Sequence, residues 1–190
     1  MKRILLLLVA VISLMPAAFA GDKKKKSTAK ASYIDSTEIQ WLDWNQVQEK
    51  MKKEPRKVWV DIYTDWCGWC KRMDATTYKN KELIKYMNTK FYAVRFNAEG
   101  RDSIRFMGKM WGFVPENRAN QLAIELMHGQ LSYPTCIFME ENFQNPSPIP
   151  GYHPVDEMEK FLKFLGENIY KTEKFEQFNQ SYSPTWTVNN

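Results

Sequence analysis

The chain has 190 residues, 44% of them hydrophobic and 14% aromatic, which is enough to bury the core of one ordinary domain without disulfide staples. Its formal net charge of +5 is too small for a nucleic-acid-binding protein, and no basic stripe interleaved with aromatic residues stands out. The composition therefore argues against a disulfide-dependent miniprotein and against a nucleic-acid partner.

The first twenty residues have the pattern of a secretory signal peptide. A basic start, Lys2 and Arg3, precedes the apolar run ILLLLVAVISLM, and alanines occupy the last and third-last positions of the segment. The run is too short for a comfortable membrane span. We therefore expect residues 1–20 to be cleaved between Ala20 and Gly21, and the mature chain, with a charge of +3, to be exported to the periplasm or another extracytoplasmic compartment.

The rest of the chain divides into three parts. The lysine-rich segment 21–35, which contains the run KKKK, is expected to be a flexible, solvated linker. Residues 36–170 carry the hydrophobic patterns of one folded domain. Residues 171–190 contain scattered aromatic residues without a strong period, and we expect them to form an extended C-terminal tail.

Helix and strand patterns alternate in the first half of the domain. Apolar residues at helical spacing predict a helix that begins at a Ser36 or Thr37 cap and ends before Pro55. The segment KVWVDIY, residues 57–63, is β-branched and aromatic like a buried strand. A helix from the following cysteines, a second helix and a strand over 91–99 complete a predicted βαβ unit.

The second half of the domain begins with an insertion. Residues 101–130 are expected to be mostly helical, most clearly in ANQLAIELMHG. The segment YPTCIFME predicts a third strand, and the proline-rich residues 145–153 predict an edge or bulged strand. An apolar stripe over residues 155–170 predicts a closing helix. The order of these elements predicts an α/β domain.

Cys67 and Cys70, in the stretch DIYTDWCGWCK, admit three interpretations. A zinc site needs about four ligands, but only Cys136, His128 and His153 remain as further soft ligands, so we expect no metal. A structural disulfide between residues three apart closes a very small loop and adds little stability. A redox pair remains the best explanation, and we expect no cofactor beyond this redox-active disulfide.

The expected position of the two cysteines assigns them different roles. Cys67 should lie where a strand ends and a helix begins, so that free backbone N–H groups and the helix dipole stabilise its thiolate. Cys70, one turn later, should be shielded and placed to attack a mixed disulfide formed by Cys67. We therefore predict Cys67 as the nucleophile and Cys70 as the resolving thiol. Cys136 is expected to be a buried, inert thiol in the third strand.

The stretch VWVDIYTDWCGWCK resembles the active-site strand and turn of thioredoxin-like proteins, especially the exported branch that includes the reducing C-terminal domain of DsbD-type interchange proteins. The shared features include Asp61, six residues before Cys67, and Trp66, immediately before it. The resemblance implies a thioredoxin-like fold, with a central mixed β-sheet flanked by helices and a helical insertion before the cis-proline strand. It also implies that Asp61 lies beneath the cysteines and handles the proton of the resolving thiol; a solvent-facing Asp61 is the alternative.

A second motif, SYPT, resembles the segment that carries the cis-proline of this family opposite the active-site disulfide. The resemblance implies that the client chain pairs with the backbone beside Pro134 and that Tyr133 touches the client. An ordinary surface aromatic is the alternative for Tyr133. The predicted substrate-binding residues are Trp66, Gly68, Trp69, Tyr133 and Pro134.

Together, the motifs predict an exported thiol–disulfide oxidoreductase of the protein-disulfide reductase type. Its partners would be disulfide-containing client proteins and, because a reductase in an oxidising compartment needs outside electrons, a membrane electron donor. Two alternatives stay open: a disulfide oxidase or isomerase, and a binding or assembly protein whose disulfide does not turn over. Trp69 stands where many thioredoxins have proline, so the motif does not define the direction of electron flow.

Overall fold

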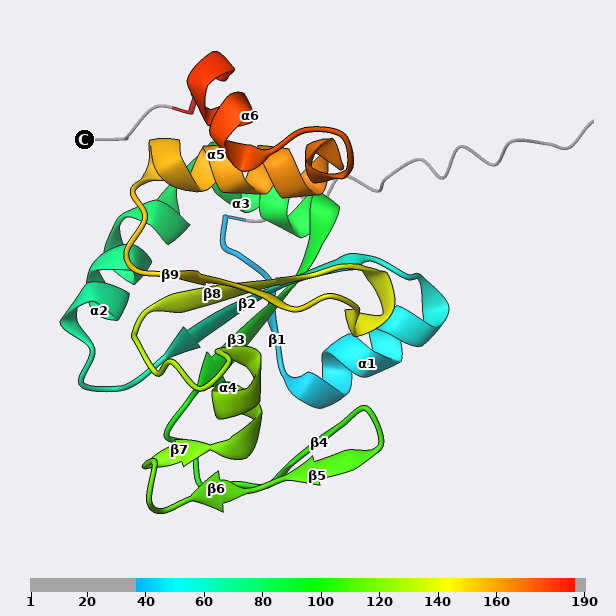
Figure 1. Cartoon of the computed structure of the whole chain (residues 1–190), viewed down its shortest axis with the longest axis vertical. Coiled ribbons are helices and arrows are strands. Elements are labelled where there is room, and N and C mark those ends of the chain that lie inside the picture. Colours follow the sequence, from blue (N-terminus) through cyan, green and yellow to red (C-terminus); the bar gives the residue numbers. More distant parts are fainter. Residues whose placement is uncertain (1–36, 187–190) are drawn as a thin grey trace, which may run out of the picture. The chain divides into compact units, whose positions relative to one another are not determined.

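Figure 1 shows the computed structural model of the chain, which describes residues 37–186. The expected signal peptide, residues 1–20, and the linker, residues 21–35, lie outside the described residues, so cleavage and export remain predictions. Within residues 37–186, no helix combines the length and apolarity that crossing a membrane requires.

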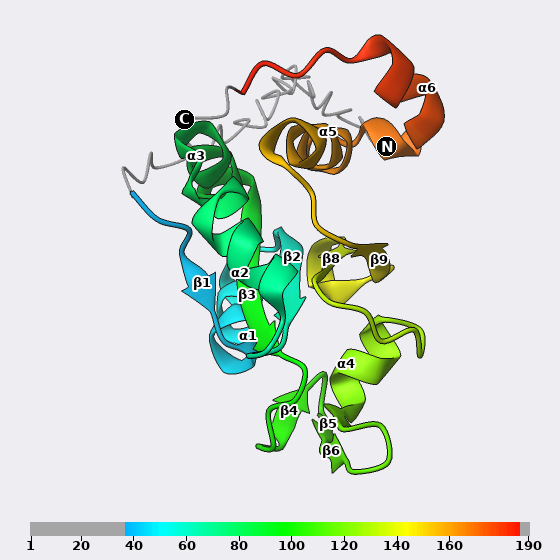
Figure 2. The same ribbon diagram turned by 90° about the vertical axis from the view of Figure 1, so that its left-hand side faces the viewer.

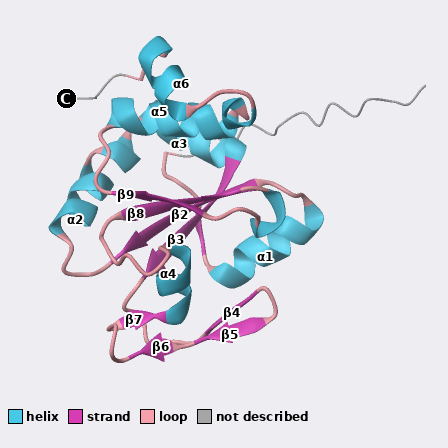
Figure 3. Cartoon of the chain, in the orientation of Figure 1, coloured by secondary structure: helices cyan, strands magenta, loops and turns pink. Residues whose placement is uncertain are grey.

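A five-stranded mixed sheet forms the centre of the domain (Figures 1 and 3). The strands lie in the order β1–β3–β2–β8–β9; β1 and β2 run parallel to β3, β8 runs antiparallel to β2, and β9 antiparallel to β8. The parallel pair β2 and β3 confirms the predicted βαβ unit, and the proline-rich β9 lies at the edge. The strands span Trp41–Leu42 (β1), Lys57–Tyr63 (β2), Phe91–Asn97 (β3), Thr135–Met139 (β8) and Ser147–Pro150 (β9).

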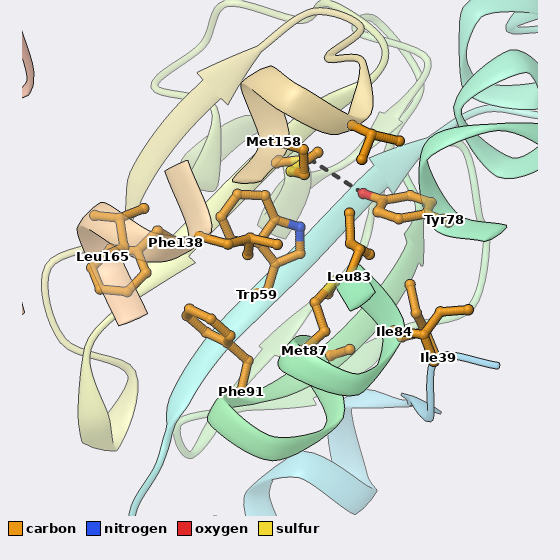
Figure 4. Close-up of a cluster of buried hydrophobic side chains, with 14 of the residues drawn as sticks. Ile39, Trp59, Tyr78, Leu83, Ile84, Met87, Phe91, Phe138, Met158 and Leu165 are labelled. Atoms are coloured by element: carbon orange, nitrogen blue, oxygen red, sulfur yellow. Dashed lines mark hydrogen bonds between the residues drawn. The ribbon is translucent and has the colours of Figure 1, made fainter. Parts of the chain in front are cut away.

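Helices cover both faces of the sheet (Figures 1 and 2). Successive side chains of a strand point to opposite faces: Trp59 of β2 lies in the core cluster of α2, α3 and α5, shown in Figure 4, whereas Val58 and Val60 pack with α1 and α4. A mixed sheet between two helical layers confirms the predicted fold class. These helices span Trp44–Lys53 (α1), Gly68–Ala75 (α2), Lys81–Lys90 (α3), Gln121–Leu126 (α4) and Val155–Gly166 (α5).

Helix α1 begins later than the sequence pattern predicted. Asp43 is its N-cap: the Asp43 carboxylate accepts hydrogen bonds from the backbone N–H groups of Asn45 and Gln46, and the Gln46 side chain accepts one from the Asp43 N–H. This capping box outcompetes a start at Thr37. Trp41 and Leu42, directly before this cap, form β1, which pairs with β3.

The insertion at residues 101–130 is mostly not helical, so that expectation was wrong. It consists of two small hairpins and one short helix, α4; the hairpins are Ile104–Phe106 with Lys109–Trp111 (β4, β5) and Phe113–Val114 with Ala119–Asn120 (β6, β7). Met107 and Gly108 turn the first hairpin with φ of 51° and 75°, as tight hairpin turns require. Arg118 (φ 52°) closes the second turn by donating its N–H to the Pro115 carbonyl at 3.1 Å.

The segment after residue 170 contains a helix, α6 (Phe175–Ser181), where an extended tail was expected. Phe178 of α6 is buried against the α5 side of the core. Beyond α6, the carboxylate of Glu159 on α5 accepts hydrogen bonds from the hydroxyl of Tyr182 at 2.7 Å and from the backbone N–H groups of Thr185 and Trp186 at 2.8 and 2.7 Å. The C-terminal segment is therefore an integral layer on α5.

Candidate active site

The two cysteines lie where the loop after β2 enters α2. Cys67 is the N-cap residue of α2, and its Sγ accepts a hydrogen bond from the Cys70 backbone N–H at 3.0 Å. The two residues form a disulfide, and each is only 3% exposed. The positive end of the helix dipole and the free N–H groups of its first turn therefore face Cys67, a position that favours a thiolate.

Exposed aromatic rings surround this disulfide. Trp66 is 65% exposed and meets Tyr133 edge-on, with ring centroids 5.9 Å apart, while Trp69 is 59% exposed and lies 5.3 Å from the ring of Tyr152. Gly68, between the cysteines, is also exposed, and no heavy atom lies near the position that a side chain would occupy. The residues proposed for substrate binding on the CxxC side therefore form an open surface.

Pro134 approaches this surface from the other side. The peptide bond between Tyr133 and Pro134 is cis. Because β8 runs antiparallel to β2 and Thr135 pairs with Ile62, the segment before β8 and the segment after β2 leave the sheet at the same end of these two strands. Pro134 is buried and Tyr133 half-buried against Trp66. The five predicted substrate-binding residues therefore lie together with the cysteines at this end of the sheet.

Asp61 lies inside the protein, on the face of β2 that carries α2, and is 1% exposed. Its Oδ1 accepts a hydrogen bond from the Tyr78 hydroxyl at 3.3 Å, and its Oδ2 lies 3.5 Å from Nε of Arg95. Burial raises the pKa of Asp61 to about 7; the Arg95 charge opposes this rise and the nearby Asp74 charge adds to it. A solvent-facing Asp61 is excluded.

The partners of Asp61 extend into a partly buried network. Arg95 donates from both terminal nitrogens to the two oxygens of Asp74 at 2.6 Å, a bidentate pair. The Tyr78 hydroxyl also lies 3.4 Å from Sγ of Cys136, which is fully buried, and Figure 4 shows the Tyr78 ring pointing into the core cluster. Burial raises the pKa of the Cys136 thiol well above its ordinary value, so this cysteine is held in the protonated form.

A surface cavity of about 500 Å³ lies beside the disulfide. Trp66 and Tyr133 form its wall nearest the cysteines, Glu99 comes from the turn after β3, and Arg118 comes from the β6–β7 turn of the insertion. The Trp66 indole N–H donates to the Glu99 carboxylate at 3.1 Å. We refer to this feature as the Trp66–Tyr133 cavity. Across residues 37–186, no group of three or more histidine, cysteine or acidic residues could hold a metal ion.

The comparison with known proteins identifies the family. The model of the thioredoxin-like domain matches residues 44–166, which is well over half of the chain. The chain belongs to the thioredoxin-like domain family. The match spans the sheet from β2 to β9, the disulfide, the insertion and α5.

The individual proteins that resemble this chain are distant from it. A thioredoxin-fold protein from Helicobacter pylori is 18% identical, with 66% of this chain and 78% of that chain covered at a TM-score of 0.52. A DsbH oxidoreductase is 15% identical, with coverages of 78% and 95% and a TM-score of 0.49. Spermatogenesis-associated protein 20 of Mus musculus is 27% identical over 67 residues, which are 35% of this chain and only 8% of that relative. The first of these structures supports the fold.

A thioredoxin-like fold with a disulfide between CxxC cysteines suggests a thiol–disulfide oxidoreductase. Sequence reasoning missed Tyr78, Arg95, Asp74 and Arg118 as neighbours of this site. Arg95 is a cation within the apolar strand FYAVRF, which indicates an anion nearby but not which residue supplies it. Asp74 of α2 is the bidentate partner, and the register of β2 and β3 places Asp61 beside Arg95 as well.

Proposed function

We propose that this protein is an exported thiol–disulfide oxidoreductase that reduces disulfides of client proteins outside the cytoplasm. The observation that carries the chemistry is the Cys67–Cys70 disulfide at the N-terminus of α2, beneath an exposed aromatic surface. Export is inferred from residues 1–20 alone. The mass of the mature protein recovered from an extracytoplasmic fraction tests export, and a chain that retains residues 1–20 would contradict it.

The proposed reaction begins from the reduced pair. The Cys67 thiolate attacks one sulfur of a client disulfide, a mixed disulfide forms, and the second client sulfur leaves as a thiolate that takes a proton. Cys70 then gives its proton to the Asp61 carboxylate and attacks Sγ of Cys67, which releases the other client sulfur as a thiolate that takes a proton from water. Two electrons pass to the client, and the protein is left with the Cys67–Cys70 disulfide.

Asp61 suits the proposed proton transfer because its pKa of about 7 lies near the working pH. A carboxyl group with this pKa is present in both protonation states and can take up and return a proton with little energetic cost. The preference for electron donation to clients rests on the resemblance of the CxxC stretch to that of the reducing C-terminal domain of DsbD-type proteins.

Reduction of insulin in the presence of a dithiol donor tests the activity. Wild-type protein is expected to accelerate the reaction and Cys67→Ser to abolish the acceleration. Full activity of Cys67→Ser, or no activity of the wild type above that of the donor alone, would contradict the proposal. A second variant, Cys70→Ser, is expected to trap mixed disulfides with several client proteins, whereas one stoichiometric partner without such adducts indicates a binding protein.

The reduction potential of the Cys67–Cys70 couple tests the direction. We expect a value near that of thioredoxin, about −270 mV, rather than that of the oxidant DsbA, about −120 mV. A strongly oxidising value would favour an oxidase or isomerase. Since a reductase is oxidised in every turnover, the proposal also requires a dithiol partner that supplies electrons, and we propose a membrane protein in this role.

A further inference from the structure

We propose that the Trp66–Tyr133 cavity binds the client residue next to the reacting cysteine, and that Arg118 makes this pocket selective for an acidic side chain. The inference rests on the proposed function and adds a specificity for clients. It assigns a role to the insertion, a segment that the redox chemistry of the cysteines and Asp61 does not require.

The cavity is placed to receive a neighbour of the attacked sulfur. Trp66 precedes Cys67 in the chain, and Tyr133 precedes the cis-proline; both side chains line the cavity and touch each other. A client sulfur at Cys67 therefore brings the adjacent client residue over this pair of rings. The volume of about 500 Å³ exceeds the space that a single side chain needs.

The insertion forms the far wall, and Asn120 fixes it to the sheet. Asn120 is fully buried; its backbone N–H donates to the Ala98 carbonyl at 2.6 Å, and its side-chain oxygen accepts from the Leu122 N–H at 2.9 Å. Its side-chain amide donates to the carbonyls of Asp102 and Trp111 at 3.3 and 3.4 Å. The turn that carries Arg118 is thereby held at a defined distance from the end of β3.

The charges lining the cavity are unequally engaged. The Glu99 carboxylate already accepts the Trp66 indole N–H at 3.1 Å. Burial raises the pKa of Tyr133, and the Glu99 charge adds to this rise. Arg118 is exposed, and within residues 37–186 its guanidinium has no hydrogen bond or ion pair with a side chain. A client carboxylate can pair with Arg118 directly, whereas a client ammonium group would share a carboxylate that already accepts the Trp66 indole N–H.

Two disulfide-linked peptides that differ in one residue test this selectivity. Both are acetylated and amidated, and the residue beside the cysteine is glutamate in one and lysine in the other. The wild type is expected to reduce the glutamate peptide with a kcat/KM about three- to fivefold higher, the range expected for an exposed ion pair. Arg118→Gln should remove the difference and Arg118→Glu should invert it.

Arg101→Gln is the matched control. Arg101 belongs to the same insertion, but its guanidinium lies over the Phe113 ring at 4.8 Å and does not line the cavity. This variant should keep the wild-type preference. An equal response of the Arg101 and Arg118 variants would indicate a general charge effect and would overturn the inference.

A binding measurement separates this inference from the proposed activity. Cysteine-to-serine versions of the two peptides are titrated against the oxidised protein while the Trp66 indole N–H resonance is followed by NMR. The glutamate peptide should shift this resonance at lower concentration than the lysine peptide, and Arg118→Gln should abolish the difference. Equal shifts, or none, would overturn the inference even if the protein reduces disulfides; if neither disulfide peptide is reduced but the binding preference holds, the proposed activity fails instead.

Discussion

The two buried acids Asp61 and Glu159 are held in opposite ways. Both are essentially inaccessible, at 1% and 0% exposure. Glu159 on α5 accepts four hydrogen bonds of 2.7–2.9 Å, all from the segment 182–186. Asp61 on β2 has a tyrosine hydroxyl at 3.3 Å and a guanidinium nitrogen at 3.5 Å, and the terminal nitrogens of that guanidinium bind a different carboxylate.

This difference distinguishes an acid that fastens two segments from one that can exchange a proton. Short charge-assisted hydrogen bonds from one segment tie that segment to the acid that accepts them. Long and shared contacts leave the desolvation of a carboxylate incompletely offset, which is why the pKa of Asp61 rises to about 7. We therefore expect Asp61 to govern pH dependence and turnover, and Glu159 to govern stability alone.

The largest expected effect concerns the pH dependence of stability. The pKa of Asp61 is raised from 3.8 to about 7 by folding, so its stabilising contribution is complete below pH 4 and is lost as the pH rises to 7. The free energy of unfolding of the wild type, relative to Asp61→Asn, should fall by about 4 kcal/mol over this range. Urea titrations of the two oxidised proteins from pH 4 to pH 8 measure the change. A constant difference would contradict it.

Turnover is the second test of Asp61. Asp61→Asn cannot accept the Cys70 proton, so kcat for disulfide reduction should fall by about 100-fold, the lower range for loss of a general base. The rate at which Cys67 forms the mixed disulfide, measured by rapid quench, should be nearly unchanged. Asp65→Asn is the control, because Asp65 is an exposed acid two residues before Cys67. Equal losses in both variants would show that negative charge alone matters.

The sequence predicted the elements whose signals are local. The buried strand at residues 57–63 and the edge strand with its prolines appear where their patterns indicated, and the helix predicted over residues 155–170 begins as expected but ends at Gly166. The start of α1 was misjudged because two sets of capping residues compete within eight positions, and only the Asp43–Gln46 box is reciprocal. Local patterns therefore predicted the elements of the fold, and competing capping patterns led to the wrong start for α1.

The missed features depend on contacts between distant segments. The hairpins of the insertion require positive φ at Met107 and Arg118, residues whose side chains give no indication of that conformation. The partners of Asp61 come from η1 (Thr77–Lys79) and β3, and only the strand register brings Arg95 beside it. A single sequence does not reveal this register, so the cysteines and Asp61 were predictable, whereas the groups that tune Asp61 were not.

Glu159, unlike Asp61, is expected to affect stability without affecting turnover. Glu159→Gln loses a charge and replaces one acceptor oxygen with a donor, so the free energy of unfolding should fall by about 2 kcal/mol. Limited proteolysis should then cut near residues 182–186 sooner, and kcat should stay at the wild-type value. Glu157→Gln on the same helix is the control, because its carboxylate is half exposed beside His153. A loss of turnover in Glu159→Gln would remove the contrast between the two acids.

The smallest expected effect comes from the hydroxyl of Tyr78. Its hydrogen bond to Asp61 lowers the pKa of that carboxyl against the larger effect of burial. Tyr78→Phe removes about 1 kcal/mol of interaction, so the midpoint of the pH–rate profile assigned to Asp61 should rise by about half to one unit. Tyr92→Phe is the control, because the Tyr92 hydroxyl donates to the Glu54 carbonyl. An unchanged or lower midpoint in Tyr78→Phe would mean that the hydroxyl serves Cys136 rather than Asp61, since the two acceptors lie at nearly equal distance from it.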